Sequence, residues 1–207
     1  MAIDAEPGRV VGTMSIEVRR VDAFTRDEAG GNPAGVVLSA EKLSPDTMQA
    51  IAAKLGYSET AFLTARNARD YEVRFFAPKK EVAICGHATV ALFHVLAETT
   101  GLLGATRMQC GVGSLGVAVE EDGRVFLAQK TPEVGEGAAK SRLATALGIP
   151  ESDLTEPVDA HRVASTGLRK IFTRVVSREV LNALNPKREA VEALSQSYGA
   201  IGVYVYT

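Results

Sequence analysis

One apolar stretch in the middle of the chain predicts a buried helix around which the other elements are organised. Residues 88–97 read ATVALFHVLA and are hydrophobic on nearly every side of a helix, which is typical of a helix buried in a core. A strand-like run at residues 74–78 precedes it, and Cys-Gly-His at residues 85–87 marks its start. We expect burial on more than one side for Val90, Ala91, Leu92, Val95 and Leu96.

The start of this helix is a candidate binding site for an anion. Its first turn would present free backbone N–H groups and the positive end of the helix dipole beside residues 85–87. Such a helix start favours a bound carboxylate. The alternative is a core helix whose initial Cys and His are incidental.

The alternation of apolar and polar positions predicts further elements on both sides of this helix. Strands are expected at residues 15–24, 34–38, 57–63, 106–110, 115–120, 124–129, 162–165, 170–176 and 201–206. Helices are expected at residues 45–55, 140–147, 177–184 and 187–198. Ser44 and Pro45 supply an N-cap and a first-turn proline for the first of these, and Gly56 ends it. Residues 27–33 have loop chemistry, and residues 121–123 favour a hairpin.

The sequence also contains an internal repeat of a helix, a glycine and a strand. Residues 48–64 align without gaps on residues 191–207, with chance similarity of two such units as the alternative. Glu59 falls opposite Gly202, so only the first copy carries the carboxylate. The first copy continues through the central helix and the hairpin, whereas the second has no counterpart of these. The second half is therefore expected to be unfinished.

Three segments follow from this organisation: a loose tail over residues 1–13, a first domain over 14–130 and a second domain over 131–207. Without a central helix, the second-domain strands at 171–176 and 201–206 are expected to lack a partner for their inner apolar faces. Burial is worth roughly 25 cal/mol per Å² of apolar surface, so a missing core helix could remove ~10 kcal/mol of stability.

Composition and charge exclude several classes of protein. A chain of 207 residues with 46% hydrophobic residues is long enough for one large or two small domains with a real core. The net charge is −2, and the 23 Lys and Arg residues are scattered along the sequence. The sequence therefore predicts no basic patch that would bind nucleic acid. No stretch reaches the roughly 18 apolar residues of a membrane helix, so no membrane partner is expected. Two cysteines without a secretory signal indicate reduced thiols and a cytoplasmic location.

Candidate chemistry begins with Glu59, which lies among mostly apolar or small neighbours. An unpaired buried carboxylate is costly, so such a residue faces the surface, is paired, or is kept for a reaction. His87 and His94 would share a helix face about 10 Å apart, too far to bind one ion, and no metal site is expected. Residues 111–116 match the G-x-G-x-x-G dinucleotide fingerprint, but a hairpin follows where a helix is required, and we reject the motif.

With these residues in view, the sequence resembles the phenazine-biosynthesis PhzF-like family, which shares the diaminopimelate-epimerase fold. The matching motifs occur in the expected order: VDAFT (21–25), GNPAGVVL (31–38), SETAF (58–62), RFFAP (74–78), CGHAT (85–89), STGL (165–168) and IGVYVYT (201–207). The resemblance implies an α+β fold of two pseudo-symmetric domains. Each would be a β-barrel around a central helix, with the active site between them and the second domain incomplete here.

The resemblance also implies the roles of individual residues. The family's acid/base glutamate lies in the S-E-T motif and maps to Glu59, and its active-site histidine maps to His87. Substrate contacts are expected from other residues of these motifs: Asn32, Cys85, Gly86, Ala88 and Gly167. Family members use no cofactor, and the namesake isomerises a dihydro-hydroxyanthranilate by moving a proton between ring carbons. We therefore expect a cofactor-independent isomerase of a small carboxylate substrate, which forms a homodimer as the family tends to.

The chain departs from the family in its second half. The family's D-P-x-T-G-S motif, which supplies an Asp and a Ser to the active site, has no match here. We therefore expect a truncated second domain and little or no turnover from the chain alone. Two other hypotheses stay open. One is a racemase or epimerase with Cys85 as a thiolate base, although the second domain offers no opposing cysteine; the other is an inactive fragment or binding protein.

Overall fold

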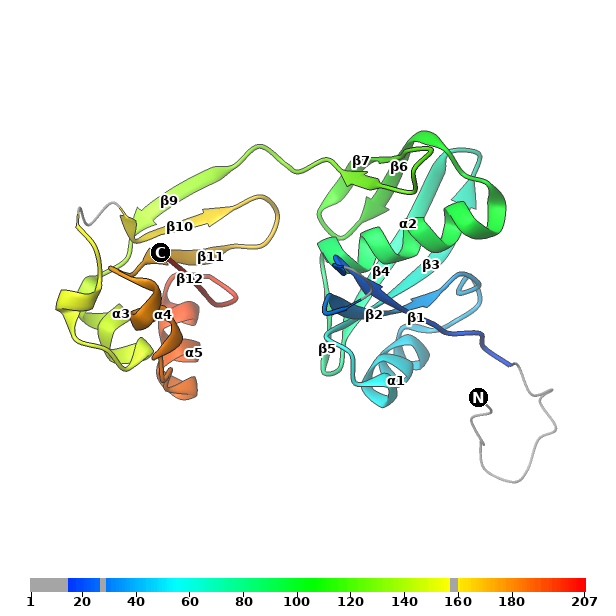
Figure 1. The fold of residues 1–207 in the computed structure, drawn as a ribbon. Helices are drawn as coiled ribbons and strands as arrows, with labels where there is room; N and C mark the ends of the chain where they lie inside the picture. Colours follow the sequence, from blue (N-terminus) through cyan, green and yellow to red (C-terminus); the bar gives the residue numbers. More distant parts are fainter. Residues whose placement is uncertain (1–14, 27–28, 157–159) are drawn as a thin grey trace, which may run out of the picture. The chain divides into compact units, whose positions relative to one another are not determined.

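The chain divides into two compact units after Ala128 (Figure 1). A computed structural model describes residues 15–26, 29–156 and 160–207. The tail expected at residues 1–13 lies outside the described residues, as do Asp27 and Glu28 of the expected loop. No helix in these described ranges is both long and apolar enough to cross a membrane.

The first unit is a mixed α/β structure whose strands form one sheet (Figure 1). Its strands are β1 (Arg19–Ala23), β2 (Asn32–Val37), β3 (Glu59–Asn67), β4 (Asp70–Ala77), β5 (Lys80–Val82), β6 (Gly104–Cys110), β7 (Gly113–Val119) and β8 (Val125–Leu127). Its helices are α1 (Pro45–Leu55) and α2 (Gly86–Thr100). The expected strands are present, but β4 begins earlier than the pattern indicates, and the pattern does not predict β5.

The sheet runs in the order β1-β2-β3-β4-β6-β7-β8, with β5 paired to β4. Two neighbouring pairs are parallel, β2 with β3 and β4 with β6, and the others are antiparallel. The sheet curls around α2, which contacts β1, β2 and β3 as well as β7 and β8 (Figure 1). Within the described residues β1 and β8, the two ends of this order, do not pair. The unit is therefore a curled half-barrel. This finding corrects the complete β-barrel that the resemblance implies.

The helix α2 forms the core of the first unit, as its apolar sequence predicts. Its buried residues are His87, Ala88, Thr89, Ala91, Leu92, Phe93, Val95 and Leu96. Tyr71 of β4 meets Phe93 edge to face, with the ring centroids 5.4 Å apart. The expected burial of Val90 is wrong. This residue is only partly buried, as are His94 and Ala97 on the following turns. These three residues form one stripe, which matches the side of the helix that a half-barrel leaves uncovered.

The other face of the sheet is covered by α1. Ser44 caps this helix by accepting a hydrogen bond from Thr47 N at 3.2 Å. Gly56 ends it in the left-handed conformation, with φ 68°. The buried residues around α1 form a second core: Val37, Ala40, Met48, Ile51, Ala52, Phe62 and Phe76. Packing on both faces therefore fixes the strands β2 and β3 between two helices.

The second unit is built around a smaller sheet in the order β12-β11-β10-β9. Its strands are β9 (Glu133–Gly137), β10 (Arg162–Ser165), β11 (Lys170–Arg174) and β12 (Val203–Tyr206). Its helices are α3 (Lys140–Leu147), the short 3-10 helix η1 (Glu151–Asp153), α4 (Arg178–Asn182) and α5 (Arg188–Ser197). The parallel pair is β11 with β12, and the others are antiparallel. The sequence pattern does not predict β9, whose Glu and Gly residues lack an apolar alternation.

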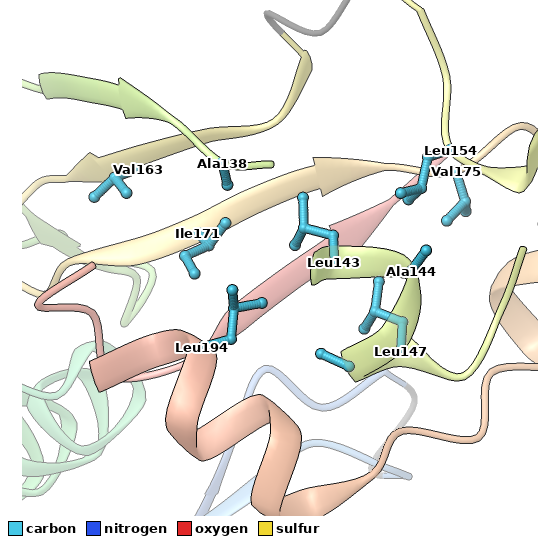
Figure 2. Close-up of a cluster of buried hydrophobic side chains, with 10 residues drawn as sticks. Ala138, Leu143, Ala144, Leu147, Leu154, Val163, Ile171, Val175 and Leu194 are labelled. Carbon is cyan, nitrogen blue, oxygen red and sulfur yellow. The ribbon is translucent and has the colours of Figure 1, made fainter. Parts of the chain in front are cut away.

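Helices cover one face of this second sheet. Figure 2 shows Val163 and Ile171 of the sheet beside Leu143 of α3 and Leu194 of α5. Ile171 is fully buried, with 0% of its surface exposed. The apolar side chains of this face therefore have a partner, whereas the inner face that the expectation concerns, which a central helix would cover, is the opposite one. The helices α3 and α5, which the sequence does predict, supply that partner.

The opposite face of the second sheet has no helical cover within the described part of its unit. Side chains alternate between the two faces of a strand, and Tyr204 and Tyr206 lie on the face away from the core of Figure 2. Tyr204 is 51% exposed and Tyr206 37% exposed. Phe172 lies beside Tyr204, with the ring centroids 5.2 Å apart. Three aromatic side chains thus remain on a sheet face that the described helices of this unit do not shield.

The glycine-rich motif at residues 111–116 lies in the hairpin between β6 and β7, where Cys110 pairs with Gly113. A Cβ at residue 111 would lie 2.7 Å from Ala83 Cα, so close packing explains this glycine. No helix follows the motif, because β7 begins at Gly113. The hairpin expected at this motif in place of a helix is confirmed.

Gly35 of β2 gives a test of the packing between β2 and β3. A Cβ at residue 35 would lie 2.8 Å from Thr60 Oγ1 and 3.1 Å from Leu55 Cδ1. We expect Gly35→Ala to lower the free energy of unfolding by about 1–3 kcal/mol, measured by urea denaturation, because it overpacks the core. Gly86→Ala is the control, since a Cβ at residue 86 meets no atom within 4 Å. Unchanged stability of Gly35→Ala would contradict this close approach.

Hydrogen exchange gives a test of the difference between the two units. Helices cover both faces of the first sheet and one face of the second. We therefore expect amide hydrogens of residues 131–207 to exchange faster than those of residues 15–129, because local opening exposes less apolar surface in the second unit. Peptide-resolved mass spectrometry measures both rates in one sample. Equally slow exchange in both ranges would show that the uncovered face costs little stability.

Candidate active site

The first turn of α2 is held in place by the burial of that helix and by a local cap. Cys85 is the N-cap residue, with an extended backbone at φ −144° and ψ 119°. Its carbonyl oxygen accepts hydrogen bonds from Thr89 N at 3.0 Å and from Thr89 Oγ1 at 2.7 Å. Gly86 and His87 are the first two helical residues. The side chains of Cys85 and His87 therefore project from a fixed support.

Parallel pairing of β2 and β3 brings Asn32 and Glu59 to one edge of the sheet. Each is the first residue of its strand, and Ala34 is the register partner of Glu59. The helix α1 forms the crossover that parallel strands require. Glu59 keeps 24% of its side chain exposed. Its carboxylate therefore lies at the edge of the core and stays open to solvent.

Glu59, Cys85 and His87 form one cluster from two separate motifs. Glu59 Oε2 lies 3.6 Å from His87 Nε2 and 3.4 Å from Cys85 Sγ. Cys85 Sγ lies 3.1 Å from His87 Nδ1. The thiol has one hydrogen, which it can donate either to the Glu59 carboxylate or to an unprotonated Nδ1 of His87. Cys85 is therefore within hydrogen-bond reach of both other groups, whereas Glu59 and His87 are separated by an ion-pair distance.

Ser58, which is not among the site residues predicted from the sequence, belongs to the same cluster. Its Oγ lies 3.3 Å from His87 Nε2 and donates to Asn32 Oδ1, also at 3.3 Å. With its hydrogen directed to Asn32, Ser58 can accept one from Nε2, which leaves Nδ1 of His87 to accept from Cys85. The sequence signal was its place directly before Glu59 in the SETAF motif.

Burial raises the pKa of the Cys85 thiol to about 12. Loss of hydration is the largest cause and disfavours the charged thiolate. The Glu59 carboxylate raises the pKa further, whereas the backbone N–H groups of Ala88 and His87 lower it. At neutral pH Cys85 is therefore a neutral hydrogen-bond donor and not a thiolate base.

The remaining expected substrate contacts lie in two places. Gly86 is exposed, and the absence of any atom within 4 Å of an added Cβ shows that its surroundings are open. Ala88 is buried, and its N–H group interacts with Cys85. Gly167 belongs to the second unit, between β10 and β11, where its N–H donates to Ser165 Oγ at 3.0 Å. Its part in the site stays a prediction.

A family model described as "Phenazine biosynthesis-like protein" matches residues 21–207. The chain belongs to this family. The match covers both units and includes all members of the cluster, so the resemblance inferred from the motifs is confirmed.

Curated relatives in the phenazine biosynthesis-like family are described as uncharacterized isomerases. YddE of Escherichia coli K12 is 38% identical over 200 residues, which cover 93% of this chain and 67% of the relative. YfhB of Bacillus subtilis is 39% identical over 174 residues, which cover 81% of this chain and 58% of the relative. The chain thus spans about two thirds or less of the length of these relatives.

Solved structures show the same fold. The Bacillus anthracis phenazine biosynthesis protein of the PhzF family aligns with a TM-score of 0.74 at 31% identity, over 89% of this chain and 64% of that one. A protein described as a predicted epimerase from Pseudomonas aeruginosa gives 0.82 at 23% identity, over 92% and 70%. A hydroxyproline epimerase from Agrobacterium vitis gives 0.53 at 12% identity, over 87% and 56%. The last two are too dissimilar in sequence to indicate more than the fold.

The raised pKa of Cys85 gives a direct chemical test. Alkylation requires the thiolate, and a pKa of about 12 instead of 9.0 leaves about 1,000-fold less of it at pH 8. We therefore expect iodoacetamide to modify Cys85 far more slowly than a small free thiol, with a rate that rises with pH up to about 12. Mass spectrometry of the Cys110→Ser variant isolates the signal of Cys85. Rapid modification at pH 8 would contradict this result and would favour a thiolate base.

Proposed function

We propose that this chain carries the acid/base residues of a cofactor-independent isomerase that moves a proton on a small carboxylate-bearing substrate. The observation that carries the proposal is the placement of the Glu59 carboxylate. It lies 3.6 Å from His87 Nε2 and 3.4 Å from Cys85 Sγ, with 24% of the side chain still exposed. The isomerase names of the relatives support this class of reaction.

Glu59 acts as the proton carrier in this mechanism. As a carboxylate it takes a proton from one substrate carbon, and as the resulting acid it returns the proton to another carbon. The thiol of Cys85 suits both states, because its hydrogen can turn from Glu59 Oε2 to His87 Nδ1 when Glu59 becomes protonated. The thiol therefore has a hydrogen-bond acceptor in both protonation states of Glu59, which limits the cost of changing between them.

His87 orients the reacting groups or shares the proton. Its side chain is 9% exposed and lies between Glu59 on one side and Ser58 on the other. With Ser58 directed to Asn32, the N–H at Nε2 can point to either Ser58 Oγ or Glu59 Oε2. This choice lets His87 support Glu59 without a change in its own backbone or helix position.

The start of α2 supplies the site for the substrate carboxylate. The first-turn N–H groups at Gly86, His87 and Ala88 and the positive end of the helix dipole favour an anion there. Gly86 is the exposed residue of this turn, and its missing side chain leaves space for a ligand. Asn32 would add a further substrate contact.

Two alternatives make different use of the same residues. A racemase or epimerase with Cys85 as the base requires a thiolate, which the pKa of about 12 opposes. A catalytically inactive binding protein would keep the carboxylate site at the start of α2 without proton transfer. The proton-sharing cluster around Glu59 favours the isomerase, because carboxylate binding alone does not require it.

The same proposal includes the organisation of the whole protein. Residues 14–130 and 131–207 would be two pseudo-symmetric diaminopimelate-epimerase-like domains, of which this chain holds the second incompletely. In support, both units contain an antiparallel pair followed by a helical crossover to a parallel strand, β2 to β3 and β11 to β12. We further propose a homodimer in the cytoplasm as the working assembly.

Deuterium exchange at substrate carbons tests this function. A panel of small cyclic carboxylates, including a dihydro-hydroxyanthranilate, is incubated in D2O and followed by NMR. Because the chain covers 67% of the Escherichia coli relative, the enzyme is tested alone and as a chimera with the uncovered part of that relative. We expect exchange by the chimera and a loss of about 10²- to 10⁴-fold in Glu59→Gln, the usual contribution of an acid/base residue.

Glu98→Gln provides the matched control for this experiment. Glu98 is an exposed carboxylate whose partner is His94, 3.4 Å away at the far end of α2, and its loss should leave exchange unchanged. Undiminished exchange in Glu59→Gln would remove Glu59 from the mechanism. Ligand binding without exchange at any substrate carbon would favour the binding protein.

A further inference from the structure

We propose that Glu59, Cys85 and His87 bind a divalent cation of the zinc class when such a cation is available. The site differs from the function proposed above, in which these residues carry protons and no metal takes part. The sequence predicts no metal site, because the two histidines of α2 are too far apart to bind one ion. The structure instead joins one of them with a thiol and a carboxylate from other positions.

The geometry of the three donors is close to that of a tetrahedral zinc site. One ligand atom from each residue can be chosen so that all lie within 4.8 Å of one another. Bond lengths of about 2.0–2.3 Å to zinc place tetrahedral donors roughly 3.3–3.8 Å apart. Cys85 Sγ and Glu59 Oε2 are already 3.4 Å apart, and Glu59 Oε2 and His87 Nε2 are 3.6 Å apart. A rotation of the His87 ring is the main adjustment that a bound ion requires.

The chemistry of the donors selects the class of cation. Sulfur, imidazole nitrogen and carboxylate oxygen together suit zinc and its neighbours, whereas magnesium and calcium prefer oxygen ligands alone. Cys85 is 8% exposed and His87 9% exposed, so packing already restricts two of the three side chains. Three protein ligands leave a fourth position for water or for a bound anion.

The charges at the site also balance. The start of α2 carries the positive end of the helix dipole, equivalent to roughly half a unit charge, which opposes a cation. A coordinating thiol gives up its proton outright, so Cys85 and Glu59 together supply two full negative charges. These exceed the opposing dipole and match the two positive charges of the ion.

Binding would block the groups that the isomerase uses, since Glu59 cannot take a proton while it coordinates a metal. This inhibitory consequence rests on the proposed function, whereas the binding itself does not. Cobalt(II) is the appropriate probe because it occupies zinc sites and reports a thiolate ligand by a charge-transfer absorption band. We expect one cobalt ion per native chain, with this band, and its displacement by zinc.

Variants of the chain without affinity tags decide the assignment. Cys85→Ser should lose the charge-transfer band, and Glu59→Gln should bind at least about 100-fold more weakly, because even outer-shell partners contribute about 10- to 100-fold. Cys110→Ser and His94→Asn alter the same residue types outside the cluster and should bind as the native chain does. Circular dichroism of each variant separates loss of a ligand from loss of the fold, and Glu59→Gln serves where Cys85→Ser does not fold.

Two results would overturn the metal site. One is a native chain that binds no stoichiometric cobalt, and the other is a charge-transfer band that persists in Cys85→Ser but disappears in Cys110→Ser. Neither result affects the proposed isomerase, which deuterium exchange tests in a metal-free buffer. Conversely, a cobalt spectrum that depends on Cys85 and Glu59 would establish the metal site even if no substrate showed exchange.

Discussion

The burial of α2 inside the curled sheet is the constraint on which the candidate site depends. Strands on both sides contact this helix, so its axis and rotation are set by apolar packing over most of its surface. A helix held in this way cannot shift its first turn without disturbing the core. Cys85 and His87 therefore occupy fixed positions, and the Thr89 hydroxyl strengthens the cap by donating to the Cys85 carbonyl at 2.7 Å.

A second constraint, the parallel pairing of β2 with β3, brings the carboxylate to that helix start. Parallel strands begin at the same edge, and α1 holds the crossover against the outer face of the sheet. The absence of a side chain at Gly35 of β2 leaves room for the side chains of Thr60 in β3 and Leu55 in α1. The position of Glu59 therefore depends on a helix, a glycine and a strand register that lie outside the site itself.

Local signals in the sequence predict the elements well, because their causes are local. Ser44 and Gly56 define α1, and the apolar run of residues 88–97 defines α2. The open edge of the half-barrel and the partial exposure of Val90 could not be predicted, since they depend on which strands meet. The same limit applies to Ser58 and to the grouping of a thiol with a carboxylate, because neither spacing nor periodicity encodes a contact between separate motifs. Family resemblance supplied Glu59 and His87, which periodicity alone left ambiguous.

The repeat within the chain shows how one local pattern can serve two environments. Ala61 and Leu63 of β3 are fully buried in the first unit, on the face opposite Phe62 and the α1 core. The aligned positions in β12 are Tyr204 and Tyr206, which are 51% and 37% exposed. A tyrosine carries an apolar ring and a polar hydroxyl, so it tolerates partial hydration better than leucine does. The second sheet therefore keeps the crossover geometry of the first, while the face that the described helices of its unit leave uncovered remains compatible with water. The candidate active-site residues lie in the first unit, whose helix α2 is enclosed by the sheet.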